Sequence, residues 1–500
     1  MASTQFSPDE PESMNVPVRR TAIRLEPDPG RVVNQIFVAG EELSTGASRA
    51  SLVMQRVLAM TDKQVDALLD DTLQRFEHRH GQLADDLLAH FEAMGGRLRP
   101  RDDLSVARCM LIGAYATNEF SVEAAALCNP SIVAHPDQTG LQPGELRFVL
   151  SLRAIGEGHI SSIEFRTGVV GASGNTVVVD DPATPLTSGR QSPARYDRAN
   201  FLALLDRHGQ GDELVGLVFD HLPATFSHLE LETSLAELHT QVLTRYEDRV
   251  YIEQIRTVAR SNYRFTFPEK SSLSQRVIRP HGPTEVNGME DARFVRFIDE
   301  GSATYYATYT AFDGAHVSPQ LLQTDDFTTF HVVQLTGPAA KNKGMALFPR
   351  RIGGRFVALS RWDRERNAVA FSSDAHHWGQ PVEIQSPEQP WELIQIGNCG
   401  SPIETDEGWL VITHGVGPMR TYSLGAILLD LDDPTKVLGK LRRPLLSPNE
   451  YEREGYVPNV VYSCGALLHD QTLVLPYAYG DRSSTIAFID LAELLDELCA

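Results

Sequence analysis

Two adjacent carboxylates and an arginine follow a glycine near the middle of the chain, where residues 287–293 read Asn-Gly-Met-Glu-Asp-Ala-Arg. The apolar run that comes next, residues 294–297, predicts a strand. A carboxylate at the mouth of a strand beside a guanidinium can be held in one rotamer, and its neighbours can set its pKa. An acid catalyst needs both a fixed rotamer and a pKa that its neighbours adjust. The structural alternative is a Glu/Asp/Arg cluster that closes a surface hairpin.

The chain that must position this segment has 500 residues, of which 42% are apolar. This length predicts two to four domains with large cores. The formal net charge of −21 excludes a basic stripe, so nucleic acid and anionic membranes are not expected as partners. A local basic pocket could still hold a small anionic substrate.

The cysteine pattern and the N-terminal segment indicate the cellular compartment of the protein, a reducing one. The five cysteines are scattered and form no CxxC motif, which favours buried free thiols over disulfides or zinc ligands. Residues 1–20 are polar and rich in proline, and no apolar run is long enough to span a bilayer. We therefore expect a soluble cytoplasmic protein.

The repeat pattern predicts the fold class. Five segments share a polar turn followed by an apolar strand, and the last four begin roughly 50 to 60 residues apart. This period predicts a mainly β protein with a five-bladed β-propeller, whereas a β-sandwich with a helical domain would not explain it. The segments are residues 145–153, 303–310, 355–361, 408–414 and 471–477.

Helical periodicity interrupts this pattern twice and sets the predicted domain organisation. We expect an N-terminal helical region and a helical insertion in the first blade, and we expect the two to pack together beside the channel mouth. There they would wall the acceptor subsites or form a contact between copies in a homo-oligomer. The predicted units are an extended, partly disordered arm (1–48), the helical region (49–120), the first blade (121–195), the helical insertion (196–255) and the remaining blades (256–500).

A propeller brings the ends of its inner strands together at the mouth of a central channel. The repeated segments end near Arg153, Arg361 and His414, while Asp291 and Lys343 open the second and third blades. Cations that converge beside isolated carboxylates indicate an anion site next to an acid. For each residue alone, the alternative is a solvated or ion-paired side chain.

These motifs carry a resemblance to a known family. Residues 288–293 resemble the Gly-x-Glu-Asp-Pro-Arg motif of glycoside hydrolase family 130, the inverting β-mannoside phosphorylases and their hydrolytic relatives. The family fold is a five-bladed propeller, and the match spans about residues 120–190 and 262–490. The chain departs from the motif at Ala292, where proline is usual, and at Thr413, where tyrosine often precedes the histidine. Further matching stretches are residues 129–130, 152–154, 343–349, 359–361, 408–416, 424–434, 457–461 and 479–481.

The resemblance implies a role for each matching residue. Asp291 corresponds to the general acid, which delivers a proton to the leaving glycosidic oxygen through the mannose 3-hydroxyl. The positions that correspond to the phosphate-binding residues are Lys343, Arg361, His414 and Tyr422. The positions that correspond to substrate-binding residues are Asn129, Arg153, Arg293 and Asp481. Of these, Arg153, Asp481 and Asn129 fall where the non-reducing mannose is held.

The residue types favour phosphorolysis over hydrolysis. An inverting hydrolase needs two carboxylates, whereas a phosphorylase needs one acid and a cationic cradle for phosphate. The expected reaction converts a β-mannoside or manno-oligosaccharide and phosphate to α-mannose 1-phosphate and the released sugar. The alternatives are an inverting β-mannosidase and a non-catalytic carbohydrate-binding propeller. In the β-mannosidase the base would be Glu404, Glu452 or Glu454.

No metal or organic cofactor is expected, and inorganic phosphate would be a co-substrate. The histidines lack the spacing of an HExxH zinc motif, and His376 and His377 are expected on a blade loop. The sequence leaves open the linkage that is cleaved and the acceptor sugar.

Overall fold

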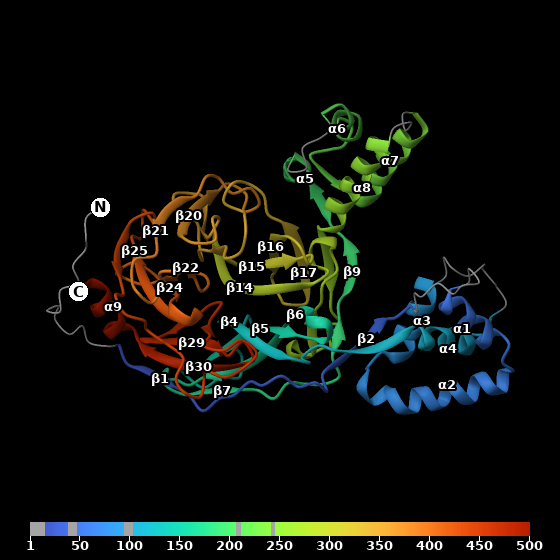
Figure 1. Cartoon of the computed structure of the whole chain (residues 1–500), viewed down its shortest axis with the longest axis horizontal. Coiled ribbons are helices and arrows are strands. Elements are labelled where there is room, and N and C mark those ends of the chain that lie inside the picture. The colour runs from blue at the N-terminus through green and yellow to red at the C-terminus, as the bar shows by residue number, and fades with distance from the viewer. Residues whose placement is uncertain (1–15, 39–47, 95–103, 207–211, 242–245) are drawn as a thin grey trace.

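The computed structural model describes residues 16–38, 48–94, 104–206, 212–241 and 246–500. The chain forms one rounded β-rich body, and two groups of helices lie outside it (Figure 1). The predicted arm over residues 1–48 falls partly on residues 1–15 and 39–47, which lie outside the described residues. Its described part contains two short strands, β1 (Val18–Arg20) and β2 (Val32–Ile36).

The largest sheet joins strands from the first third and the middle of the chain. Its two halves meet through a single pair of residues, Gly288 and Ser161, where β14 runs parallel to β6. In order, its strands are β4 (Ala126–Ala134), β5 (Leu146–Ile155), β6 (Ser161–Val170), β14 (Gly288–Asp299), β15 (Ser302–Phe312), β16 (Val317–Thr324), β17 (Thr329–Gln334), β12 (Tyr263–Thr266) and β9 (Arg190–Pro193). The short strands β13 (Arg276–Ile278), β7 (Val177–Val179) and β8 (Thr187–Ser188) pair at its side.

Three smaller antiparallel sheets follow from the rest of the chain. The first contains β18 (Ala346–Leu347), β19 (Phe356–Ser360), β20 (Asn367–Ser372) and β21 (Val382–Gln385). The second contains β22 (Gln395–Asn398), β23 (Ile403–Glu404), β24 (Trp409–Val416), β25 (Tyr422–Leu429) and β26 (Val437–Lys440). The third contains β27 (Val461–Tyr462), β28 (Leu467–His469), β29 (Thr472–Tyr479) and β30 (Ser483–Asp490), and β1 pairs with β30. Two-stranded sheets join β2 to β3 (Thr117–Ser121) and β10 (Arg195–Asp197) to β11 (Thr225–Ser227).

The mainly β character predicted from the repeats is confirmed, because each of the five repeated segments contains a strand of these sheets, β5, β15, β19, β24 or β29. None of the sheets in the described ranges closes on itself. The five-bladed propeller therefore stays a prediction.

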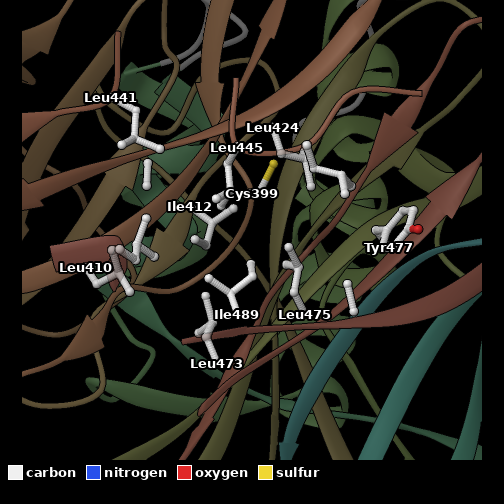
Figure 2. Close-up of a cluster of buried hydrophobic side chains, with 14 of the residues drawn as sticks. Cys399, Leu410, Ile412, Leu424, Leu441, Leu445, Leu473, Leu475, Tyr477 and Ile489 are labelled. Carbon is white, nitrogen blue, oxygen red and sulfur yellow. The ribbon is translucent and has the colours of Figure 1, made fainter. Parts of the chain in front are cut away.

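Every second side chain along the strands points into the buried core. Leu410 and Ile412 of β24 and Leu473 and Leu475 of β29 point from two neighbouring sheets into one buried cluster (Figure 2). The spacing of two puts these side chains on the inner face of each strand. The C-terminal helix α9 (Leu491–Cys499) adds Leu494 and other leucines to the same cluster. This packing fixes β24 and β29, the strands that lead into the candidate site.

The N-terminal helical region is confirmed. Its helices are α1 (Arg49–Leu58), α2 (Asp62–Phe76), α3 (Leu83–Met94) and α4 (Val106–Tyr115). Met54, Val57 and Leu111 belong to a buried cluster within this group. Residues 95–103 of the predicted helical region lie outside the described residues.

The second helical group contains α5 (Arg198–Asp206), α6 (Asp212–Phe219), α7 (His228–Gln241) and α8 (Tyr246–Arg260). It has its own buried cluster, in which Phe201, Phe219 and Phe226 contact one another. The expectation that the two helical groups pack together is wrong, because Figure 1 shows them well apart, one above the other, and they bury their apolar faces in different clusters.

All five cysteines are free thiols, but only Cys128, Cys399 and Cys464 are buried. The expectation of buried thiols is wrong for Cys499, which is exposed near the C-terminal end of α9. Within the described ranges, no helix is both long enough and apolar enough to cross a bilayer.

Candidate active site

A cavity of about 240 Å³ brings together side chains from all parts of the β-rich body. Eight of the nine residues predicted from the sequence line it, and Arg293 is the exception. The lining residues are Asn129, Arg153, Asp291, Lys343, Arg361, Gln395, His414, Arg420, Tyr422, Val460, Tyr462 and Asp481.

Two bulges aim Asn129 and Asp291 at each other. The pairing of β14 shifts between Glu290 and Arg293, and Asp291 has a φ of 56°. The pairing of β4 shifts in the same way around Asn129, whose φ is 48°. Positive φ is uncommon for residues other than glycine, and such strain is typical of functional sites. As a result, Asn129 Nδ2 donates a hydrogen bond of 2.5 Å to Asp291 Oδ1.

The start of β14 requires a glycine. Gly288 has a φ of 140°, and a Cβ atom there would lie 2.9 Å from the backbone nitrogen of Ser161. Any side chain would therefore push β14 away from β6. This close approach explains why the bulge that carries Asp291 begins with a glycine.

Glu290 is the counter-ion of two cations in the cavity. Its Oε1 lies 2.6 Å from Arg153 Nη2, and its Oε2 pairs with Lys343 Nζ. Arg153 Nη1 also lies 3.5 Å from Asp291 Oδ1. The two carboxylates of the motif therefore hold Arg153 from two directions, and Glu290 links it to Lys343.

The two carboxylates in the cavity wall have opposite pKa shifts. Burial opposes ionisation of Asp291, but the positive charges of Arg153, Lys343 and Arg293 outweigh it and lower the pKa of Asp291 to about 2. Burial raises the pKa of Asp481 to about 6, against the attraction of Arg153. Environments that push two pKa values apart are typical of acid–base sites. In the free protein Asp291 is therefore ionised, and Asp481 titrates under mildly acidic conditions.

His414, which also lines the cavity, is neutral. Burial and the charges of Arg361 and Arg293 hold the pKa of His414 well below its usual value. Arg361 Nη1 lies 3.1 Å from His414 Nε2, and an arginine can only donate, so Nε2 accepts and the proton lies on Nδ1. The expectation that His414 is a cation is thus wrong, because its burial beside two guanidinium groups excludes a further positive charge. It orients Arg361 instead.

Arg293 is not among the residues that line the cavity. Its side chain is buried, and it donates hydrogen bonds to the Tyr462 hydroxyl at 2.9 Å and to the carbonyl oxygen of Asp291 at 3.1 Å. The bulge over residues 290–293 interrupts the alternation of β14, so Arg293 does not line the cavity although it is only two residues from Asp291. It supports the bulge from behind.

Comparison with known proteins identifies the family of this chain. Residues 237–499, just over half of the chain, match a family model of glycoside hydrolase family 130 described as beta-1,4-mannooligosaccharide phosphorylase. This chain belongs to glycoside hydrolase family 130.

Two curated proteins are similar to this chain over about half of its length. A 1,2-beta-oligomannan phosphorylase of Thermoanaerobacter sp. (strain X514) is 32% identical over 238 residues, which cover 44% of this chain and 75% of that protein. A beta-1,2-mannobiose phosphorylase of Listeria innocua serovar 6a is 32% identical over 250 residues, or 48% of this chain and 68% of that protein.

A third curated relative and a solved structure complete the comparison. A beta-1,4-mannooligosaccharide phosphorylase of Ruminococcus albus is 34% identical over 185 residues, or 35% of this chain and 55% of that protein. The solved structure of beta-1,2-mannobiose phosphorylase from Listeria innocua with beta-1,2-mannobiose aligns with a TM-score of 0.45 and 22% identity. That alignment covers 76% of this chain and 93% of that chain.

Four lining residues were not predicted from the sequence of this family 130 protein. Arg420 lies in the short turn between β24 and β25, where both Met419 and Arg420 have positive φ. A basic residue in the loop just beyond the strand of His414 was a usable signal. Val460 lies within the matching stretch 457–461 but was not singled out, and Gln395 and Tyr462 carried no signal, because their strands β22 and β27 are short and have no chemical motif.

The glutamates considered as hydrolytic bases lie outside this cavity. Glu404 pairs with Arg350 on the surface, and Glu452 is buried against Arg20 and Tyr477. Glu454 lines a different cavity. None of the three is among the residues that line the candidate active site of this family 130 protein.

Proposed function

We propose that this chain is an inverting β-mannoside phosphorylase, which converts a β-mannoside and inorganic phosphate to α-mannose 1-phosphate and the released sugar. One observation carries the proposal. The bulged Asp291 and a separate set of phosphate-type residues, Lys343, Arg361 and Tyr422, line the same cavity. Family 130 relatives named as mannoside phosphorylases support it.

In the proposed complex, each end of the cavity holds one reactant. Arg153, Asn129 and Asp481 would hold the non-reducing mannose. Lys343, Arg361 and Tyr422 would hold the phosphate, with His414 fixing the guanidinium of Arg361. Phosphate needs no base, because it arrives as a nucleophile, and cations that offset its charge can align it behind the anomeric carbon.

The reaction breaks the bond between the anomeric carbon and the glycosidic oxygen and forms a bond from that carbon to a phosphate oxygen. Asp291 would supply the proton to the leaving oxygen through the mannose 3-hydroxyl. Burial alone would raise the pKa of Asp291, but the positive charges of Arg153, Lys343 and Arg293 outweigh this effect and lower it in the free protein. A bound phosphate dianion would offset these charges and raise the pKa of Asp291. Phosphate binding would thus prepare the acid as well as deliver the nucleophile.

The proposal includes two structural statements. The four larger sheets would form the blades of a five-bladed propeller, with the twelve-stranded sheet contributing two of them. Copies of the chain would associate through the helical groups, where Leu229 and Val106 are exposed apolar side chains. An experimental structure would test the first statement, and light scattering of the full chain would test the second.

The deciding experiment is phosphate dependence. Purified protein is incubated with β-1,2-mannobiose, β-1,4-mannobiose, mannosyl-glucose and mannosyl-N-acetylglucosamine, with and without phosphate, while α-mannose 1-phosphate and mannose are quantified. We expect mannose 1-phosphate only with phosphate, and its loss in Asp291→Asn. Asp299→Asn, at the far end of β14, is the matched control and should keep full activity.

Three outcomes would contradict the proposal. Free mannose released without phosphate would mean that the protein is a hydrolase. Absence of both products from all four sugars would favour a binding protein. Full activity of Asp291→Asn would remove Asp291 as the acid.

A further inference from the structure

Tyr462 lines the active-site cavity, but the proposed reaction leaves it without a role. It belongs to the short strand β27, and its side chain is almost fully buried. Its ring meets that of His414 edge to face, with the two centroids 4.9 Å apart, and the ring of Tyr422 is 6.4 Å away. Tyr462 therefore lies among the residues that the proposal assigns to phosphate.

The hydroxyl of Tyr462 has a hydrogen bond left to donate. Its oxygen accepts from Arg293 Nη2 at 2.9 Å, and an arginine can only donate. Burial raises the pKa of Tyr462 well above its usual value, so the phenol keeps its proton at neutral pH. Within the described ranges this hydroxyl forms no second hydrogen bond. A ligand in the cavity that accepts from it would satisfy a buried donor.

Arg293, the partner of this hydroxyl, is a buried cation without a carboxylate in contact. Its side chain donates to the Tyr462 hydroxyl and to the carbonyl oxygen of Asp291, while its Nε has no partner. Among the residues that the structure describes, Arg293 forms no ion pair. A buried charge that no carboxylate pairs is costly. An anion that binds nearby would reduce this cost.

Arg361 contributes a second charge of the same kind. In the described part of the chain it also forms no ion pair, and its Nη1 lies 3.1 Å from the neutral His414. The charges of Arg361 and Arg293 both lower the pKa of His414, so both guanidinium groups act on the same ring. Two positive charges without a carboxylate partner therefore surround His414, and Tyr462 packs against it.

We propose that the Tyr462 hydroxyl is a phosphate ligand and that Arg293 is a positioning residue that acts on the phosphate through it. Arg293 donates to the phenol oxygen and thereby polarises the hydroxyl, which donates in turn to a phosphate oxygen. The charge of Arg293 thus acts on the anion although its guanidinium does not line the cavity. This inference rests on the proposed function and adds two residues to its phosphate site.

The same guanidinium connects the phosphate site to the acid. Arg293 holds the carbonyl oxygen of Asp291 at 3.1 Å and the hydroxyl of Tyr462 at 2.9 Å. One rigid group therefore fixes the backbone that carries the acid and a ligand of the nucleophile. Reactants that are held in a fixed relative position react faster, because less entropy is lost in the reaction step.

The first test compares the two substrates in Tyr462→Phe, which removes the hydroxyl and keeps the ring. We expect KM for phosphate to rise about tenfold or more, the loss of one hydrogen bond to a charged group, and KM for the mannoside to stay unchanged. Tyr305→Phe is the matched control. Tyr305 is also buried, its hydroxyl donates to the carbonyl oxygen of Ala134 at 2.8 Å, and it does not line the cavity. This variant should change neither KM.

Arg293 is tested in combination with Tyr462. Arg293→Lys keeps a cation but loses the planar fork that reaches both partners. It should raise KM for phosphate in the wild-type background and raise it little further in the Tyr462→Phe background, because the charge acts through the hydroxyl. An equal rise in both backgrounds would show that Arg293 does not act through Tyr462, which would overturn that part of the inference.

Phosphate binding without a sugar separates this inference from the proposed function. Inorganic phosphate is titrated calorimetrically into the wild type, Tyr462→Phe and Tyr305→Phe. Weaker binding in Tyr462→Phe alone would support the inference even if no mannose 1-phosphate forms. Equal affinity of the wild type and Tyr462→Phe would overturn it even if phosphorolysis occurs. An equal loss in Tyr305→Phe would also overturn it, because the effect would then not depend on a hydroxyl in the cavity wall.

Discussion

At the scale of single residues, Glu290 offsets the positive charges of two cations in the site when no substrate is bound. It pairs with Arg153 at 2.6 Å and with Lys343, so two cations that the substrates would use are held by one carboxylate. An incoming phosphate must compete with Glu290 for Lys343. The charge of this residue therefore affects both proposed reactants.

The variant Glu290→Gln separates these two effects. Without the negative charge, we expect phosphate to bind more tightly and KM for phosphate to fall. Arg153 loses its orienting partner, so kcat/KM for the mannoside should fall about tenfold or more, as for other charged hydrogen bonds in a site. Steady-state kinetics with each substrate varied measures both. Glu404→Gln, which breaks a surface pair with Arg350, is the control and should change neither value. A KM for phosphate that rises in Glu290→Gln would contradict the prediction.

The raised pKa of Asp481 predicts that kcat/KM for the mannoside depends on pH. Burial raises its pKa to about 6, so the carboxyl is protonated below that pH and ionised above it. A carboxylate that accepts hydrogen bonds from mannose must be ionised. We therefore expect kcat/KM for the mannoside, at saturating phosphate, to rise as the pH increases through about 6 and then to level off. The rise should disappear in Asp481→Asn and persist in Asp299→Asn. A rise at the same pH in Asp481→Asn would assign it to another group.

At the scale of elements, Gly113 sets the distance between α3 and α4. A Cβ atom at Gly113 would lie 1.8 Å from the carbonyl oxygen of Leu87. The two helices can therefore approach each other this closely only with glycine at this position. We predict that Gly113→Ala destabilises the N-terminal helical region by about 1 to 3 kcal/mol, measured by thermal unfolding and hydrogen exchange in α3 and α4.

A second glycine within a helix provides the control. At Gly216 of α6, a Cβ atom would lie no closer than 3.5 Å to its neighbours, at Asp220. Gly216→Ala should stabilise the protein by about 0.5 to 1 kcal/mol, because alanine restricts the unfolded chain. If both variants were equally stable, close packing of α3 and α4 would not be the reason for Gly113.

At the scale of the whole molecule, a buried network fastens the N-terminal segment to the largest sheet. Arg31 lies 2.8 Å from Glu123 and 2.7 Å from Glu164, and Arg166 contacts both glutamates. Arg31, Glu123 and Glu164 have fully buried side chains. Removing one member of such a network leaves an uncompensated buried charge.

Arg31→Met tests this connection. We expect a loss of about 3 to 5 kcal/mol in the free energy of unfolding, measured by urea denaturation. The control is Arg75→Ala, which removes an exposed pair with Asp71 and should cost less than about 1 kcal/mol. A similar small loss in both variants would mean that the network is not needed to hold the N-terminal segment.

Much of the candidate site could be predicted from the sequence because its residues stand at strand ends marked by local patterns. Asp291 lies between a glycine and an apolar run, Arg361 directly follows β19, and His414 lies near the end of β24. Turn residues and the alternation of strands are properties of short segments, so they can be read without knowledge of the fold. The mainly β character and the N-terminal helices follow from the same local signals.

Only the tertiary structure decided how these residues act on one another. The neutral state of His414, the pairing of Glu290 with both Arg153 and Lys343, and the turning of Arg293 toward Tyr462 depend on burial and on partners distant in the chain. Charge and pKa inside a cavity are set by these neighbours and not by residue type alone. The separation of the two helical groups was also beyond local patterns, because an apolar helix face does not specify which surface covers it.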